Sequence, residues 1–154
     1  MSGQTNKIIA QTNVEILALH YFTNGLYCSE AILKAFNEEY ELKLPAKAMR
    51  MATGFGTGFG NSKCSCGCIT GAILVTSSIL GRTSASKSEK PAFEASKEIH
   101  DTFKDSFKYT CCRALTKDVE WGSKEHHEEC QKYVIAATRI AEEIVKREYC
   151  TTNC

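Results

Sequence analysis

The sequence predicts an all-α protein, a single-domain bundle of five to six helices around a buried central helix. Three observations support this prediction. Apolar residues recur at intervals of three and four along most of the chain, which is the helical period. Runs with the alternating pattern of strands are scarce. The two prolines, Pro45 and Pro91, each stand where a helix can begin. The 154 residues suit one domain, 1–154, with its core over about residues 13–149.

Three helices are expected in the first third of the chain. Asn13 is expected to cap the first helix, which runs to Asn24 and stops at Gly25. The second starts near Ser29, and the third starts at Pro45. The apolar positions of the first two helices are Val14, Leu17, Leu19, Tyr21 and Phe22, then Ala31, Ile32, Ala35 and Phe36.

Between Gly54 and Gly60, four glycines alternate with other residues. Because glycine adopts conformations that other residues avoid, this segment is expected to be a flexible loop. It is not a dinucleotide-binding fingerprint, since Phe59 stands where a third glycine is required. It is not a phosphate-binding loop either, because no Gly-Lys-Ser/Thr sequence follows.

The central helix is expected over about Cys66 to Leu80, a stretch that is apolar nearly all round. Gly67 and Gly71 lie on one face of it, which lets a neighbouring backbone approach closely and is compatible with a dimer. A fifth helix is expected to carry the stripe Phe93, Ser96, His100, Phe103 and Phe107. A short turn or helix follows at 111–115. The last helix, about 124–149, has the stripe Cys130, Tyr133, Val134, Ala137, Ile140, Ala141 and Ile144.

Charge and hydropathy narrow the function. The chain has 19 basic and 18 acidic residues, so a net charge of +1 gives no electrostatic reason to expect nucleic acid or an anionic membrane as a partner. The longest apolar stretch is too short to span a bilayer. The first residues lack the pattern of a secretory signal. We therefore expect a cytoplasmic protein.

Cysteine is the unusual feature of the composition. Structural disulfides are disfavoured in a reducing cytoplasm, and a chain of this length can fold without them. An odd number of cysteines also argues against a purely internal disulfide framework. Metal binding or redox chemistry is therefore expected. The nine are Cys28, Cys64, Cys66, Cys68, Cys111, Cys112, Cys130, Cys150 and Cys154.

The most informative segment is Cys64-Ser65-Cys66-Gly67-Cys68, where a glycine-rich loop meets the start of a helix. Free N–H groups at a helix start favour a thiolate over a thiol, and a thiolate is what both metal ligation and nucleophilic chemistry require. Glycines beside the sulfurs allow amides to donate to them. We expect Cys64, Cys66, Gly67 and Gly71 to line a cofactor site.

The other cysteines fall into two groups. Cys28 starts a helix, and Cys111 and Cys112 lie beside Arg113, a cation that stabilises a thiolate. Cys130 is expected on the core side of the last helix. Cys150 and Cys154 are expected to be peripheral.

The histidines are expected to have no part in the site. His20 and His100 stand on helices near apolar stripes. His126 and His127 could ligate a metal, but with acidic neighbours after Ser123 they indicate a charged helix start instead.

Four motifs together resemble the redox-active protein family named for its Cys…Gly-Cys-Ala-x-x-Gly…Cys…Cys pattern. They are Tyr27-Cys-Ser-Glu-Ala-Ile-Leu, Gly67-Cys68-Ile-Thr-Gly71, Cys112-Arg113-Ala-Leu and Cys130-Gln-Lys-Tyr-Val, and they span about residues 14–144. The resemblance implies a small helical domain with a redox role. It places the four family positions on Cys28, Cys68, Cys112 and Cys130. This sequence departs from the pattern at Ile69, where the family has alanine, and it adds Cys64, Cys66 and Cys111.

Three functions remain open from the sequence. In the favoured one, Cys28, Cys68, Cys112 and Cys130 hold an iron–sulfur cluster or another metal centre that exchanges electrons with a redox partner protein. In the second, a metal-free thiol–disulfide oxidoreductase, Cys68 attacks and Cys112 or Cys130 resolves. In the third, a zinc ion stabilises a module without catalysis.

Overall fold

The computed structural model describes residues 8–153, with side chains to residue 150. Five helices in this part exceed ten residues: α1 (Asn13–Thr23), α2 (Cys28–Glu39), α5 (Gly67–Leu80), α6 (Lys90–Phe107) and α8 (Lys124–Asn153). Shorter helical segments are α3 (Ala46–Arg50), the 3-10 turn η1 (Thr53–Phe55), α4 (Gly56–Phe59) and α7 (Cys112–Leu115). The described residues contain no strand, so the all-α prediction is confirmed.

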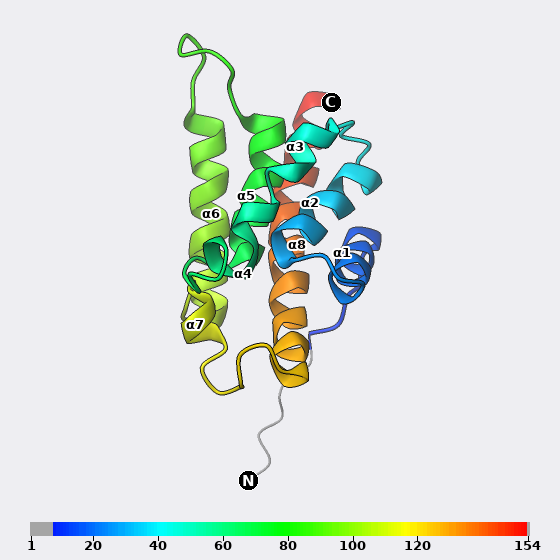
Figure 1. The fold of residues 1–154 in the computed structure, drawn as a ribbon. Helices are drawn as coiled ribbons and strands as arrows, with labels where there is room; N and C mark the ends of the chain where they lie inside the picture. Colours follow the sequence, from blue (N-terminus) through cyan, green and yellow to red (C-terminus); the bar gives the residue numbers. More distant parts are fainter. Residues whose placement is uncertain (1–7, 154) are drawn as a thin grey trace.

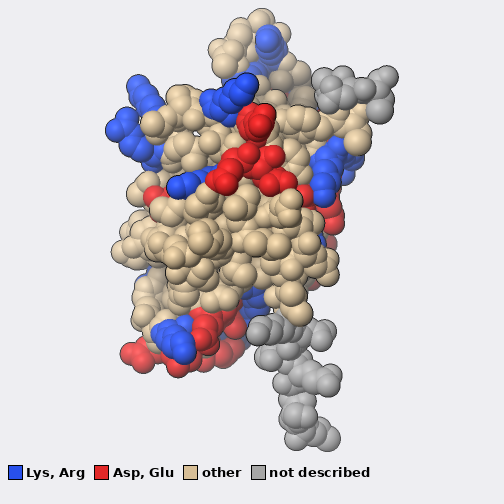
Figure 2. All heavy atoms as spheres, turned by 90° about the vertical axis from the view of Figure 1, so that its right-hand side faces the viewer, with Lys and Arg blue, Asp and Glu red and all other residues tan. Residues whose placement is uncertain are grey.

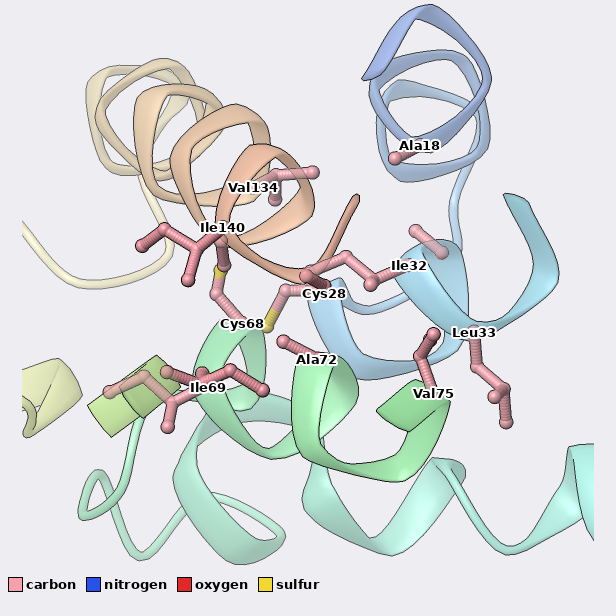
Figure 3. Packing of buried hydrophobic residues seen from close by; sticks show 14 of the residues in the cluster. Ala18, Cys28, Ile32, Leu33, Cys68, Ile69, Ala72, Val75, Val134 and Ile140 are labelled. Carbon is pink, nitrogen blue, oxygen red and sulfur yellow. The ribbon is translucent and has the colours of Figure 1, made fainter. Parts of the chain in front are cut away.

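Helix α5 lies among three other long helices, α2, α6 and α8, as Figure 1 shows. Its mostly apolar residues are the reason, because they supply buried side chains on several faces. Figure 3 shows Ile69, Ala72 and Val75 of α5 meeting Ile32 of α2 and Ile140 of α8. The expected central helix is therefore present.

The helix starts differ from the prediction by one residue. Thr12, rather than Asn13, caps α1: its Oγ1 accepts a hydrogen bond from the Glu15 N–H at 3.4 Å. Threonine can cap as asparagine does, and the extended backbone of Thr12 puts its hydroxyl in position. Helix α2 begins at Cys28, and the Glu30 carboxylate accepts from the backbone N–H of Tyr27 at 2.9 Å.

The stripe expected on α6 is partly wrong. Phe93 is 69% exposed and His100 is also exposed, while Ala95, Ile99 and Phe103 are buried. Both sets of residues have helical spacing, so spacing alone does not choose between them. The contacts of α6 with α5 and α8 select the buried set.

Helix α8 is longer than expected. It runs to Asn153, so Cys150 lies within it, with an exposed side chain, rather than at a frayed end. Cys154 lies outside the described residues.

The surface carries both signs of charge. Figure 2 shows Lys and Arg interspersed with Asp and Glu above and below a band of other residues, on the face that includes α1. Among the described residues, no helix combines the length and the apolar character that crossing a bilayer requires.

Candidate functional site: a cavity lined by five thiols

The start of α5 is fixed by a hydrogen bond from another part of the chain. The Cys66 N–H donates to the carbonyl of Thr110 at 2.7 Å, which joins the start of α5 to the residues before α7. Cys66 is the N-cap of α5, and its carbonyl accepts the first helical hydrogen bond, from the Ile69 N–H at 3.0 Å. The Cys66 side chain is thereby held at a helix start, beside the first N–H groups of that helix.

Four buried thiols meet at this point. Cys112, the first residue of α7, contacts Cys66, which in turn contacts Cys68. Cys68 contacts Cys28, the first residue of α2. Figure 3 shows the Cys28 sulfur reaching from α2 toward the start of α5, where Cys68 lies. Three sequence-distant segments thus bring their sulfurs into one connected group, which we call the thiol chain: Cys112, Cys66, Cys68 and Cys28.

Gly67 makes room for this thiol chain. A Cβ atom at Gly67 would lie 2.5 Å from the Cys28 sulfur and 3.0 Å from the carbonyl oxygen of Phe55. Contacts this short do not occur between real atoms, so only glycine lets Cys28 lie against the backbone of α5 here. One turn later, a Cβ at Gly71 would lie 2.8 Å from the Cα of Ser29. Gly71 therefore lets α2 and α5 approach closely. It was expected to line the site, but it does not line the cavity.

The thiols have opposite proton affinities. The pKa of Cys66 is held well below its usual range by hydrogen bonds from Cys112 and Cys68, while burial opposes this effect and the N–H groups of Cys68 and Ile69 reinforce it. Burial raises the pKa of Cys68, and its bonds with Cys28 and Cys66 raise it further. The bond to Cys66 raises the pKa of Cys112, and burial adds to the increase. The arrangement therefore favours one thiolate, at Cys66, with a protonated thiol on either side.

The thiol chain forms part of the wall of a cavity of about 290 Å³. Exposed residues, among them Tyr27, Asn61 and His127, line it as well, so the cavity reaches the surface. Cys130 is the fifth thiol, and burial raises its pKa. The full lining is Phe22, Tyr27, Cys28, Thr57, Asn61, Cys66, Cys68, Cys112, Leu115, Thr116, Trp121, Gly122, Ser123, His126, His127, Cys130 and Tyr133.

The remaining described cysteines lie away from this cavity. Cys64 is exposed, although it stands two residues before Cys66. The Cys111 thiol donates to the carbonyl of Lys63 at 3.0 Å and so ties α7 to the preceding loop. Cys150 is exposed on α8. The structure thus brings together Cys28, Cys66, Cys68, Cys112 and Cys130, and it does not bring Cys64 into the group.

The segment before Cys66 is folded tightly, contrary to the flexible loop expected for Gly54 to Gly60. Thr57, Asn61, Lys63 and Ser65 all have positive φ, between 50° and 70°. A β-branched residue such as threonine rarely adopts this conformation. At Gly58, with φ +68°, a Cβ would lie 2.6 Å from the backbone nitrogen of Cys64, so the chain folds back closely on itself. Glycine here permits the chain to fold compactly.

Sequence reasoning missed the aromatic and imidazole part of the wall. His126 was assigned to a charged helix start, yet its ring lies against that of Trp121, with centroids 4.4 Å apart and planes tilted by 43°, and its Nε2 lies 3.9 Å from the Cys130 sulfur. Burial lowers the pKa of His126, and nearby His127 and Lys63 lower it further. The spacing of four between His126 and Cys130 was a usable signal, because it puts both side chains on one face of a helix.

The fit of a metal centre depends on how the donors are arranged. The four cysteines expected as ligands all line the cavity. Within residues 8–153, however, no three Cys, His, Asp or Glu side chains are placed so that they could hold one ion. The thiols form a connected chain rather than a shell around a common point. This arrangement does not fit a metal ion or cluster, and the iron–sulfur centre stays a prediction.

Comparison with known proteins gives one match. The family model described as "putative redox-active protein (C_GCAxxG_C_C)" matches residues 26–144, which is most of the chain. The matched region contains all five cysteines that line the cavity. No curated protein and no solved structure matches the chain.

Proposed function

This chain belongs to the C_GCAxxG_C_C family, and from that premise we propose that it is a thiol–disulfide oxidoreductase whose reactive pair is Cys66 and Cys112. The observation that carries the proposal is the thiol chain itself, in which these two sulfurs are direct neighbours. We assign the attacking role expected for Cys68 to Cys66, because the pKa of Cys66 is lowered by its hydrogen bonds while burial raises the pKa of Cys68.

The chemistry follows the usual course of disulfide exchange. The Cys66 thiolate attacks one sulfur of a substrate disulfide. The substrate S–S bond breaks, a mixed disulfide forms on Cys66, and the first substrate thiolate leaves and takes up a proton. The Cys112 thiol then loses its proton and attacks the Cys66 sulfur. The mixed disulfide breaks, a Cys66–Cys112 disulfide forms, and the second substrate thiolate leaves.

The electrons balance over these two steps. The substrate disulfide gains two electrons and becomes two thiols, while Cys66 and Cys112 lose two electrons and become a disulfide. A dithiol reductant, acting as the redox partner, must return the pair to its reduced form. Cys68 and Cys28 are not consumed, and Cys68 supports the thiolate by its hydrogen bond to Cys66.

The test uses reduced protein prepared without oxygen and then treated with hydroxyethyl disulfide. Peptide mapping under non-reducing conditions should recover a Cys66–Cys112 pair. Cys112→Ser should accumulate the mixed disulfide on Cys66, because the resolving thiol is absent. Cys66→Ser should lose exchange, whereas the matched controls Cys64→Ser and Cys111→Ser should keep it, because neither side chain lines the cavity.

Two results would overturn the assignment. One is a wild-type disulfide that joins other cysteines, which needs no variant and is unaffected by folding defects. The other is undiminished exchange in a Cys66→Ser protein whose circular dichroism matches that of the wild type.

A metal centre is the second candidate function. Its support is the convergence of Cys28, Cys68, Cys112 and Cys130 on one cavity. If such a centre forms, the thiols must first rearrange, because their present placement offers no three-donor site among the described residues. Metal and acid-labile sulfide analysis of anaerobic protein separates the candidates. Stoichiometric iron and sulfide would replace the disulfide proposal, and one tightly held zinc ion would favour the structural module.

A further inference from the structure

We propose that the substrates of this site are small-molecule disulfides with an apolar or aromatic body, and that disulfides of folded proteins are excluded. The inference rests on the proposed function and adds the substrate class. It is carried by three features of the cavity: its size, the depth of the reactive sulfurs, and the composition of its wall.

Size and depth limit what can reach Cys66. The Cys66 and Cys112 side chains are 4% and 8% exposed. The route to them is a cavity of about 290 Å³, at the lower end of the ~300–1,000 Å³ typical of small-molecule sites. Exchange requires the attacking sulfur to align with the S–S bond it breaks. A disulfide inside a protein is flanked by chain on both sides, so it cannot bring that bond down to a sulfur at this depth.

The wall favours an apolar body. Phe22, Leu115, Trp121 and Tyr133 all line the cavity, and among the described residues no Asp or Glu does. The wall is also held in place by stacked rings. Phe22 and the His127 ring stack with centroids 4.4 Å apart and planes 4° apart. The His126 ring lies against the Trp121 ring, and the Lys63 ammonium lies 4.4 Å from the Trp121 ring centroid.

Two carboxylates that bond to residues of the wall, Glu129 and Glu30, are already engaged, so they offer little to a cationic substrate. Glu129 accepts from the Tyr133 hydroxyl at 3.0 Å and pairs with Lys132. Glu30 accepts from the Tyr27 N–H and from the Thr53 hydroxyl, at 2.9 and 2.7 Å. A cationic substrate group would therefore lose its hydration in the cavity without gaining a free carboxylate from either of them.

The first experiment measures access without any variant. Reduced protein is treated with iodoacetamide or with a maleimide attached to a polyethylene glycol of several kilodaltons, and each cysteine is followed by peptide mass spectrometry. Iodoacetamide should label Cys66, and the bulky maleimide should not. Exposed Cys64 is the internal control and should react with both. Bulky labelling of Cys66 as fast as that of Cys64 would overturn the size limit.

The second experiment compares aliphatic disulfides of increasing size: hydroxyethyl disulfide, glutathione disulfide and the disulfides of insulin. Each rate is divided by the rate of the same disulfide with free dithiothreitol, which removes differences in intrinsic reactivity. The normalised rate should fall by about 100-fold from the first to the last, because the larger disulfides cannot align with Cys66. Equal normalised rates would overturn the inference but leave the proposed function intact. Absence of exchange with all three would instead overturn the proposed function.

The third experiment tests the wall. Dithiodipyridine, normalised in the same way, should be preferred over hydroxyethyl disulfide. Trp121→Ala should reduce that preference by roughly tenfold, since it removes an apolar ring from the cavity. Phe93→Ala is the matched control, because Phe93 is 69% exposed on α6 and does not line the cavity. Should Trp121→Ala fold poorly, Tyr27→Ala removes a half-exposed ring from the same wall. An unchanged preference in both variants would overturn the role of the wall.

Discussion

At the scale of single residues, Cys66 unites two influences that favour a thiolate within a protein core. Its own helix supplies the N–H groups of Cys68 and Ile69, and its neighbours Cys112 and Cys68 supply S–H donors. Burial works in the opposite direction, because it penalises the charged form. The pKa of Cys66 is lowered overall because four donors surround its one sulfur. This is the local reason why one thiol of the group, rather than all, is expected to react.

The pH dependence of alkylation tests this residue directly. Because hydrogen bonds hold the pKa of Cys66 well below its usual range, we expect its sulfur to gain little from further deprotonation above pH 7. Its rate with iodoacetamide should therefore change less than about threefold between pH 7 and 9. A free thiol with a pKa of about 8.5 gains about 25-fold over that range. N-acetylcysteine provides the comparison, and a parallel rise at Cys66 would contradict the prediction.

Gly67 gives a second prediction at this scale. Gly67→Ala puts a methyl group 2.5 Å from the Cys28 sulfur, so that sulfur must move. Overpacking of this kind costs about 1–3 kcal/mol in the free energy of unfolding. Gly54→Ala is the control, since nothing lies within 4 Å of the added atom and Gly54 does not have a positive φ. Urea unfolding of both variants checks the result. Equal stability would mean that Cys28 does not lie against α5 as described.

At the scale of helices, the thiol chain depends on where three helices begin. Cys28 and Cys112 are the first residues of α2 and α7, and Cys66 caps α5. A one-residue shift in any of these starts would turn a sulfur by about 100° around its helix. The starts are held by bonds to other segments, such as Cys66 N–H to Thr110 and Arg113 N–H to Lys63. The positions of the sulfurs are therefore fixed by hydrogen bonds that connect these helix starts to other segments of the chain.

Gly71→Ala tests the packing of α2 on α5. The added methyl would lie 2.8 Å from the Ser29 Cα and 3.1 Å from its carbonyl oxygen, and backbone cannot move aside as a flexible side chain can. We expect a loss of about 2–3 kcal/mol, at or above that for Gly67→Ala. Because α2 carries Cys28, disulfide exchange should slow as well. Thermal unfolding and the exchange rate are the measurements. A stable variant with full exchange would show that the helices do not approach this closely.

At the scale of the whole molecule, an ion pair with a buried carboxylate joins the first helix to the last. Glu15 of α1 is fully buried, and its two carboxylate oxygens accept from the Arg139 guanidinium of α8 at 2.8 and 2.9 Å. Burial alone would raise the pKa of Glu15, but the bonds from Arg139 and from the backbone outweigh it and lower the pKa below 4.5. The charged form is therefore the one that stabilises the fold.

The sign of the pH effect follows from that shift. A group whose pKa is lowered on folding adds stability above its unfolded pKa, and this stability is lost as the pH falls through the folded pKa. Glu15→Gln should cost about 2 kcal/mol in the free energy of unfolding at pH 7. The difference from the wild type should shrink below pH 4.5.

The control for this measurement is Glu98→Gln, which breaks a similar pair with Arg147 on the surface. There the side chains of Glu98 and Arg147 are 43% and 54% exposed. Solvent screens such a pair, so the expected cost is below about 1 kcal/mol. Comparable losses in the free energy of unfolding for Glu15→Gln and Glu98→Gln would contradict the prediction that the Glu15 pair contributes more.

Much of the fold could be predicted because helical periodicity is a local property. Val14 and Phe22 on α1, Ile32 and Phe36 on α2, and Val134 and Ala141 on α8 are buried as their spacing indicates. Phe93 on α6 is the counter-example, since two stripes of equal spacing compete there and only contact with α5 selects between them. The paired glycines show the same limit. They were compatible with a dimer, yet Gly67 and Gly71 are accounted for by Cys28 and Ser29 of the same chain. The dimer remains a prediction.

The sequence by itself determined that this protein is helical, rich in cysteine and related to one redox-active family, because composition, period and ordered motifs are properties of the chain. Only the tertiary structure decided which thiols meet. Cys64 and Cys66 stand two residues apart with the same local chemistry, yet one is exposed and the other buried against Cys112, 46 residues further along. Contact between distant residues depends on how helices pack, and that depends on the fit of whole surfaces rather than on spacing along the chain.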